Sequence, residues 1–366
     1  MKPFVRYIVP ALLWGAAAAY LTYAAGAARR LHAGRTVSRV EVEIADSSSQ
    51  GYLVSGRQVL RWISEAGIPT VGTAVDEVRL DGIERLIARN GFVDRVAASV
   101  PYDGGLRIRI TQRKPLLRLL TDGMDSYVTA EGYAFGAPRA SSLHVPVVTG
   151  PYRPPFPADY AGSVREYADE QLRLVDKRIG ELEREKYPLY RRELQNDRNI
   201  AALRRMRVKR RWWRLESSDR FEQRVGELRE RKAQLRRRYR YEARLIQEGI
   251  DRLSARQEEE RRKQKKLEKS YEDFMKLLTF VEFVEDDGFW RSEVVQIVAH
   301  TTPSGALEVE LVPRSGRHTV LFGRLEEVER KFDKLMRFYR SGLRSIGWDE
   351  YGTIDVRYGN QVVCKK

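Results

Sequence analysis

The side chains that most often carry catalysis are few and scattered in this sequence of 366 residues. Its histidines do not follow the spacing of metal ligands, and adjacent carboxylates such as Asp286 and Asp287 usually face apart or cap a helix instead of forming an acid/base pair. We find neither a phosphate-binding loop nor a serine-based triad. The sequence therefore predicts a non-enzymatic protein without a metal or cofactor. The histidines are His32, His144, His300 and His318.

Charge and cysteine content narrow the class of protein further. Lys and Arg number 67 against 51 Asp and Glu, a formal net charge of +16, which suggests nucleic acid, anionic lipid or an acidic partner as ligand. Residues 160–275 hold 34 of the basic and 23 of the acidic residues and so supply most of the excess. The single cysteine, Cys364, excludes an internal disulfide and a Cys-based zinc site, and we interpret it as a small apolar residue.

Residues 7–28 carry no charge and predict a transmembrane helix. At helical rise they would extend about 33 Å, close to the apolar thickness of a bilayer. A cleaved signal peptide is the alternative, because Lys2 and Arg6 precede the segment and small residues end it. Its apolar core is longer than the roughly 7–15 residues usual for signal peptides, which favours an uncleaved anchor. The basic residues on its two sides do not decide the orientation.

The next part of the chain, residues 37–114, predicts a compact domain with the order strand, helix, helix, strand, strand. The second of these elements has Ser55 as a candidate N-cap and Gly67 just past its end. Asp103, Gly104 and Gly105 form a strong hairpin signal between the last two strands. We expect the elements at residues 37–44, 54–66, 80–90, 93–100 and 106–112.

A β-domain is expected on both sides of a charged segment. Short strands are predicted at residues 116–120, 126–129, 133–135 and 145–148, with turns at Asp122-Gly123 and Glu131-Gly132. A proline-rich linker, Pro151 to Pro157, follows. After the charged segment we expect a helical start at 277–285, strands at 294–300, 306–312 and 318–322, an amphipathic helix at 325–341, and final strands at 352–357 and 361–364.

Residues 160–275 break the β pattern and predict an antiparallel helical hairpin of the coiled-coil type. A non-helical break at 216–219 divides it into arms of equal length, about 50 residues or 75 Å each. Such a hairpin returns to its starting point and can be inserted into a β-domain. Pro188 is expected to kink the first arm, whose apolar stripe is Ala168, Leu172, Val175, Ile179, Leu182 and Leu189.

The second arm has its own seam, with several polar interruptions. The seam consists of Phe221, Val225, Leu228, Leu235, Tyr239, Ile246, Leu253, Leu267 and Phe274, interrupted by Lys232, Glu242, Arg256, Glu260 and Lys263. Basic runs with aromatic residues, Arg204 to Trp213 and Arg236 to Arg240, suit nucleic acid. A solvated spacer, or a coiled coil that binds an acidic protein, anionic lipid or wall polymer, is the other interpretation.

Several short motifs occur in the parts of the chain outside the charged hairpin. They are VPVVTG at 145–150, GFW at 288–290 with VVQI at 294–297, ELVPRSGRH at 310–318 with Gly323, and, most specifically, IDVRYGNQVVCKK at 354–366. In these motifs the chain resembles the FtsQ/DivIB family of cell-division proteins, in its Bacteroidetes-type version. The layout is similar as well: a short tail, one membrane helix, a small βααββ domain of the POTRA type and a β-domain. The resemblance covers roughly residues 1–157 and 275–366 and leaves out the charged hairpin.

The resemblance implies a non-catalytic scaffold of the division machinery in the inner membrane. A cytoplasmic tail (1–6) and a membrane helix (7–28) would precede an exported, periplasmic body, composed of a POTRA-like domain (37–114), a β-domain in two parts (115–157 and 276–366) and the inserted hairpin (160–275). Members bind small coiled-coil membrane proteins of the FtsB/DivIC and FtsL types and help control septal wall synthesis. The POTRA-like domain is implied to contact other division proteins.

The same resemblance implies where the partner binds. In the family the partner adds a strand beside the last strand of the β-domain, and a terminal strand at a sheet edge does leave backbone groups unpaired. The implied contact residues are Tyr358, Asn360, Gln361, Val362, Val363 and Cys364. Two alternatives stay open: an outer-membrane assembly factor, since POTRA-type domains also serve there, and a basic coiled-coil protein that binds an acidic polymer or nucleic acid.

Overall fold

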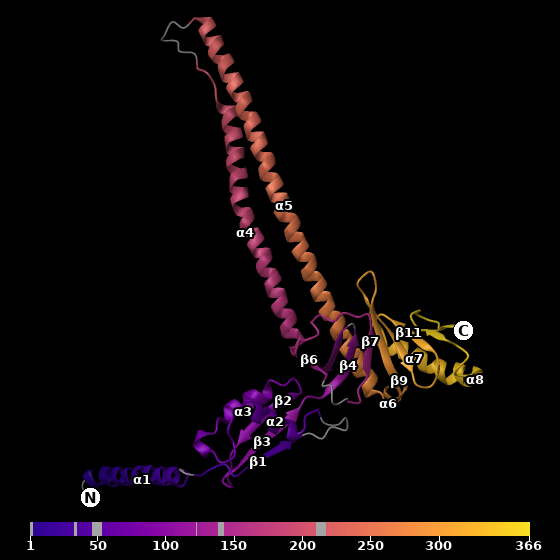
Figure 1. The fold of residues 1–366 in the computed structure, drawn as a ribbon. Coiled ribbons are helices and arrows are strands. Elements are labelled where there is room, and N and C mark those ends of the chain that lie inside the picture. Colours follow the sequence, from indigo (N-terminus) through magenta and orange to yellow (C-terminus); the bar gives the residue numbers. More distant parts are fainter. Residues whose placement is uncertain (1–2, 33–34, 46–52, 122, 138–142, 210–216) are drawn as a thin grey trace. The chain divides into compact units, whose positions relative to one another are not determined.

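A computed structural model describes residues 3–32, 35–45, 53–121, 123–137, 143–209 and 217–366 of the chain (Figure 1). The chain divides into two compact units. The first comprises Met1–Arg153, Pro157–Ser163 and Lys276–Lys366, and the second comprises Pro154–Phe156 and Val164–Met275. The charged segment that interrupts the β pattern therefore forms a unit separate from the strands on either side of it in the sequence.

The uncharged N-terminal segment lies within helix α1 (Pro3–His32), whose side chains are described for residues 13–27. Among the described residues, we find no helix with both the length and the apolar character needed to cross a membrane. Residues 1 and 2 of the expected tail, and the side chains of residues 7–12 and 28 of the expected membrane segment, lie outside the described residues.

The POTRA-like region has the predicted order of elements. Strand β1 (Arg39–Ile44), helices α2 (Gly56–Glu65) and α3 (Leu80–Ala88), and strands β2 (Val93–Ser99) and β3 (Gly105–Gln112) follow one another, with a short 3₁₀ turn, η1 (Val75–Glu77), before α3. The sheet order is β1-β3-β2, with β1 parallel and β2 antiparallel to β3. One face is covered by the helices, whose buried Val59, Ile63, Ile83 and Ile87 pack in one core with Leu106, Ile108 and Ile110.

Local signals set several of these boundaries. The Ser55 hydroxyl accepts a hydrogen bond from the Gln58 amide (3.3 Å), so the predicted N-cap is confirmed. Gly67 (φ +64°) follows the end of α2, and Gly104 (φ +76°) lies in the predicted hairpin turn. A positive φ is strained for residues with a β-carbon, which explains glycine at both positions. Helix α3 ends at Ala88, two residues before the predicted end.

The β-domain is a single sheet built from strands before and after the hairpin. Its order is β13-β12-β11-β10-β9-β7-β4-β5-β6-β8. Strand β7 pairs with β9 in parallel, with Val148 opposite Ile297, and so joins the two parts of the domain. The strands are β4 (Pro115–Thr121), β5 (Met124–Thr129), β6 (Tyr133–Gly136), β7 (Val147–Gly150), β8 (Gly162–Ser163), β9 (Val294–Thr301), β10 (Leu307–Pro313), β11 (Thr319–Gly323), β12 (Thr353–Asp355) and β13 (Val363–Lys365).

Several predicted boundaries in this domain were wrong. Strand β7 begins at Val147 instead of Val145, and β8, with two residues, gave no sequence pattern. The predicted helix at 325–341 is α7 (Val328–Phe338), followed by a π-helical turn, η2 (Tyr339–Leu343), and a short α8 (Arg344–Ile346). Residue 122 of the predicted Asp122-Gly123 turn lies outside the described residues.

An aromatic core fills the C-terminal half of the β-domain. Phe332 of α7 lies 4.9 Å from Phe322 of β11 and 4.7 Å from Trp290 between ring centroids. Trp290 belongs to α6 (Gly288–Glu293), a helix that the sequence did not predict. The Asp287 carboxylate accepts hydrogen bonds from the amides of Phe289 and Trp290, so this carboxylate caps a helix, as adjacent acidic residues were expected to do.

Helices α4 (Val164–Arg205) and α5 (Ser218–Asp286) form the hairpin, and Figure 1 shows them side by side. Gln264 donates to Asp176, Lys186 to Gln257, and Asn196 to the Tyr239 carbonyl, so the paired residue number falls along α5 as it rises along α4. This order of contacts makes the helices antiparallel. Helix α4 runs on through Pro188 as one helix.

The prediction of equal arms was wrong. Helix α4 has 42 residues and α5 has 69. The first helix ends at Arg205, and the described residues 206–209 after it are not helical, whereas α5 continues past residue 275 to Asp286. Its last turns belong to the first unit, where Leu277, Phe280 and Val281 are buried. Residue 216 of the predicted break lies outside the described residues.

Candidate partner-binding edge

The last strand of the chain lies at one end of the ten-stranded sheet. Strand β13 pairs with β12 alone, in antiparallel register, with Cys364 opposite Ile354 and Val363 opposite Asp355. Within the described part of the chain, no strand pairs with the other side of β13. Edge strands leave a row of backbone donors and acceptors without strand partners, and an added strand can use them.

The six predicted contact residues fall into two groups. Val363 and Cys364 belong to β13, whereas Tyr358, Asn360, Gln361 and Val362 lie in the turn that precedes it. The predicted final strand at 361–364 therefore began two residues too early and ended one residue too soon. The Tyr358 side chain is 49% exposed, and Asn360 and Gln361 are exposed as well, so the turn and the strand together present side chains to solvent.

Helix α7 holds this turn by two cationic side chains that the sequence did not identify. The Lys334 ammonium donates to the Val356 carbonyl (2.7 Å) and to the Tyr358 carbonyl. The Arg330 guanidinium donates to the Asn360 side-chain oxygen (2.9 Å). Burial lowers the pKa of Lys334 below its ordinary value. We call these contacts the α7 clamp, because they fix the backbone that carries Tyr358 and Asn360.

A charged pair braces the other end of the turn. The Asp355 carboxylate, which is buried, accepts hydrogen bonds from the Arg357 guanidinium (2.6 Å to Nη2) and from the Arg357 amide (3.0 Å). Burial by itself raises the pKa of Asp355, but the hydrogen bonds from Arg357 outweigh it, and the pKa lies below the ordinary value. The carboxylate therefore stays ionised and holds the chain as it leaves β12.

Cys364 lies on the edge strand with a half-buried side chain. Burial raises the pKa of its thiol, so the reactive thiolate is scarce near neutral pH. Among the described residues, no group of three or more His, Cys, Asp or Glu side chains is placed to hold a metal ion.

The fold thus defines a POTRA-bearing protein whose second domain ends in an open sheet edge. Comparison with known families gives two matches in this order: a "POTRA-like domain" at residues 35–111 and "FtsQ/DivIB, C-terminal related" at residues 259–365. The comparison with curated proteins gave no match. Together the two family matches support the FtsQ/DivIB-family membership that the sequence motifs indicated, and the combination of domains suggests a cell-division protein.

Proposed function

We propose that this protein is a non-enzymatic scaffold of the division machinery that binds a partner by strand addition at β13. The partners are small membrane proteins of the FtsB/DivIC and FtsL types, and through them the protein helps to control septal peptidoglycan synthesis. Further division proteins bind at the POTRA-like domain. These assignments rest on the family matches and on the resemblance of the C-terminal motif.

The position of β13 is the single observation that carries the proposal. An edge strand without a neighbour is a liability for aggregation unless it is short, charged or covered. Strand β13 has only three residues, and Lys365 and Lys366 close the chain. A partner strand would gain main-chain hydrogen bonds along β13, while the exposed turn before it would supply side-chain contacts.

The first experiment measures co-purification of the full-length protein with its FtsB/DivIC- and FtsL-type partners. Tyr358→Ala removes an exposed aromatic ring, and Val363→Glu puts a charge on the edge strand. We expect each to lower recovery about tenfold, the effect typical of a central interface residue. Val295→Glu is the control, because it puts the same charge on an exposed valine of β9, a strand inside the sheet. Unchanged recovery with both edge variants, at unchanged melting temperature, contradicts the site.

We also propose that residues 7–28 anchor the protein in the inner membrane, with residues 1–6 in the cytoplasm and the body in the periplasm. The uncharged run in the sequence supports this assignment. Alkaline carbonate washing should leave the full chain in the membrane pellet, and protease added to spheroplasts should degrade the body. A mature chain that begins after residue 28, or a body protected from the protease, contradicts this topology.

A further inference from the structure

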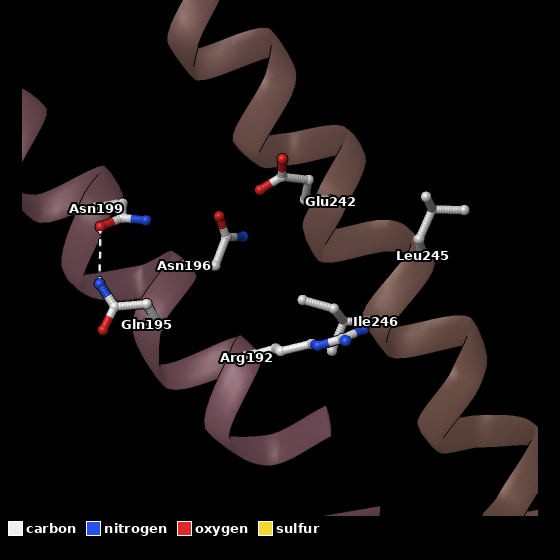
Figure 2. Close-up of a pocket in the computed structure, with 7 residues that line it drawn as sticks. All are labelled: Arg192, Gln195, Asn196, Asn199, Glu242, Leu245 and Ile246. Carbon is white, nitrogen blue, oxygen red and sulfur yellow. Dashed lines mark hydrogen bonds between the residues drawn. The ribbon is translucent and has the colours of Figure 1, made fainter. Parts of the chain in front are cut away.

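The hairpin carries a pocket of about 330 Å³ between α4 and α5 (Figure 2). Helix α4 contributes Arg192, Gln195, Asn196 and Asn199, and α5 contributes Glu242, Leu245 and Ile246. Two helices packed along a continuous seam leave no such space between them. Here the side chains on one flank of the seam are too short or too polar to close it. The pocket is therefore a groove on the surface of the hairpin and a place where a third element can dock.

One wall of the pocket holds a buried polar atom without a partner. Asn196 is only 4% exposed, and its Nδ2 donates to the Tyr239 carbonyl across the hairpin (2.9 Å). Its Oδ1 is buried and has no hydrogen-bond partner. A buried acceptor without a donor destabilises the fold, and a donor that reaches it removes this cost. Gln195 donates its Nε2 to the Asn199 Oδ1 (3.0 Å), whereas the Asn196 Oδ1 is the acceptor on this wall that is buried without a donor.

The opposite wall has two apolar residues, Leu245 and Ile246, beside Glu242, whose carboxylate accepts a hydrogen bond from Arg238 (2.9 Å) and is thereby offset in charge. Leu245 is 49% exposed, and the neighbouring Ile246 lies partly buried in the seam. Leu245 and Ile246 therefore offer an apolar contact of the kind that receives the apolar face of an amphipathic helix. The Asn196 oxygen lies on the facing helix as a hydrogen-bond acceptor.

Charge differs sharply between the two halves of the hairpin. Residues 191–209 and 217–248 hold 17 Lys and Arg against eight Asp and Glu. Residues 164–190 and 249–275, which form the other half, hold 14 of each. Because the helices are antiparallel, the two basic segments lie side by side, and the pocket belongs to this basic half. The half of the hairpin that contains the groove therefore attracts a negatively charged partner.

We propose that the groove is a docking site for an acidic, amphipathic α-helix of a partner protein. The apolar stripe of that helix covers Leu245 and Ile246, a donor on it satisfies the Asn196 oxygen, and its acidic faces meet the surrounding arginines. A polyanion such as nucleic acid would use the basic charge but not the apolar wall. A second copy of this chain would place its own positively charged hairpin against the basic half, and the two would repel each other.

The test uses the full chain and a helical peptide of about four heptads, with leucine on one face and glutamate on the others. Fluorescence anisotropy should show binding that weakens with salt. Leu245→Glu should raise Kd about tenfold. Leu194→Glu is the matched control: Leu194 is 54% exposed on α4, does not line the pocket, and receives the same charge. A version of the peptide with lysine in place of glutamate should not bind.

Four results would overturn the proposal. The acidic peptide could fail to bind, or Leu194→Glu could weaken it as much as Leu245→Glu, which would leave charge alone as the cause. A single-stranded oligonucleotide of about 20 thymidines could bind more tightly than the peptide and compete with it, which would indicate a polyanion surface. Sedimentation could show a dimer of the chain that Leu245→Glu dissociates, which would make a second copy the occupant. Circular dichroism checks that each variant keeps its helix content.

Discussion

Gly91 lies so close to Phe135 that a β-carbon at residue 91 would be 2.6 Å from the Phe135 β-carbon. Gly91 ends the α3 region of the POTRA-like domain, whereas Phe135 belongs to β6 of the large sheet. The adjacent Phe92 meets the Phe135 ring edge to face at 6.0 Å. Phe135 therefore belongs to the core of the POTRA-like domain, and the two domains share one apolar cluster.

We expect Gly91→Ala to destabilise the first unit by about 1–3 kcal/mol, because the added methyl group must displace the Phe135 backbone or ring. Urea unfolding followed by tryptophan fluorescence measures the change. Gly136→Ala, beside Phe135, is the control, since a β-carbon there has no neighbour within 4 Å. Equal stability of the two variants would mean that the two domains do not share this core in solution.

Because of the α7 clamp, we expect Lys334 to affect partner binding without contacting the partner. Lys334→Met removes the hydrogen bonds to the Val356 and Tyr358 carbonyls and frees the turn before β13. We expect partner recovery to fall several-fold while the melting temperature changes by only a few degrees. Lys331→Met is the matched control, because Lys331 donates to the carbonyls of Phe322 and Arg324, away from the turn. Similar recovery from the two variants would exclude a positioning role for Lys334.

Cys364 gives a direct readout of access to the edge strand, because it is the only cysteine in the chain. Burial raises its pKa, so alkylation by iodoacetamide near pH 7 should be slower than for a free peptide cysteine and should speed up as pH rises. A bound partner strand should slow it further. Mass spectrometry of the intact chain follows the reaction. An alkylation rate that a saturating partner leaves unchanged would argue against pairing at β13.

Sequence patterns predicted the parts of this fold that local chemistry determines. Ser55 and Gly67 bracket α2 because a cap and a positive φ are properties of a few consecutive residues. The α7 clamp was not predictable in this way, because Lys334 and Tyr358 are brought together only by tertiary packing. The helix predicted at 277–285 is present, but its continuity with the second arm of the hairpin as the single helix α5 was not predicted, because its last turns are held by buried contacts in the β-domain.

The hairpin seam shows a second limit of predicting structure from an apolar sequence pattern. Apolar seam residues such as Ile246 and Leu253 are partly buried, as predicted, but Arg256 and Lys263 are exposed and the seam passes through Gln257 and Gln264 instead. An apolar pattern cannot locate a seam where its members are polar. For the partner-binding residues, the family motif supplied the candidates, and the structure added only their place at the edge.

We expect the folded protein to lose stability in mild acid because of the buried His318. It is 1% exposed, and its Nε2 lies 2.9 Å from the Tyr339 hydroxyl. Burial lowers its pKa below 6.5, the value expected for the unfolded chain. Protons therefore bind the unfolded state first as pH falls through 6.5, and the free energy of unfolding decreases until the lower folded pKa is passed. Well above 6.5 the histidine is neutral in both states and contributes no slope.

The measurement is urea unfolding between pH 7.5 and pH 5, as an experimental window around the unfolded value. His318→Gln keeps a hydrogen-bonding amide and removes the titration, so its stability should fall less steeply over this range. His300→Gln is the control, because His300 lies at the surface of β9, 3.8 Å from the Glu308 carboxylate. Parallel slopes for the wild-type chain and His318→Gln would show that His318 does not drive the acid loss.

Lys186 and Gln257 form the central polar contact of the hairpin. The Lys186 ammonium donates to the Gln257 oxygen at 2.6 Å, and the Gln257 amide donates to the Glu183 carboxylate at 3.0 Å. Both side chains are almost fully buried. Glu183 contacts both side chains, because its carboxylate also lies 3.6 Å from the Lys186 ammonium. Removing Lys186 leaves the buried Gln257 oxygen without its donor, and removing Gln257 takes an acceptor from the buried ammonium. Lys186→Leu and Gln257→Leu should therefore each destabilise the hairpin, by about 1–3 kcal/mol.

The double variant should behave differently, because two leucines replace a polar pair with an apolar contact in the same seam. Such replacements are often neutral or stabilising by about 1–4 kcal/mol. A double-mutant cycle, measured by urea unfolding of the full chain at 222 nm, gives the coupling between the two residues. If each single change costs nothing and the double variant is additive, the contact makes no net contribution. A strong coupling together with a more stable double variant would show that the polar pair lowers the stability of the hairpin. In that case we infer that the pair is there to fix the register of α4 on α5.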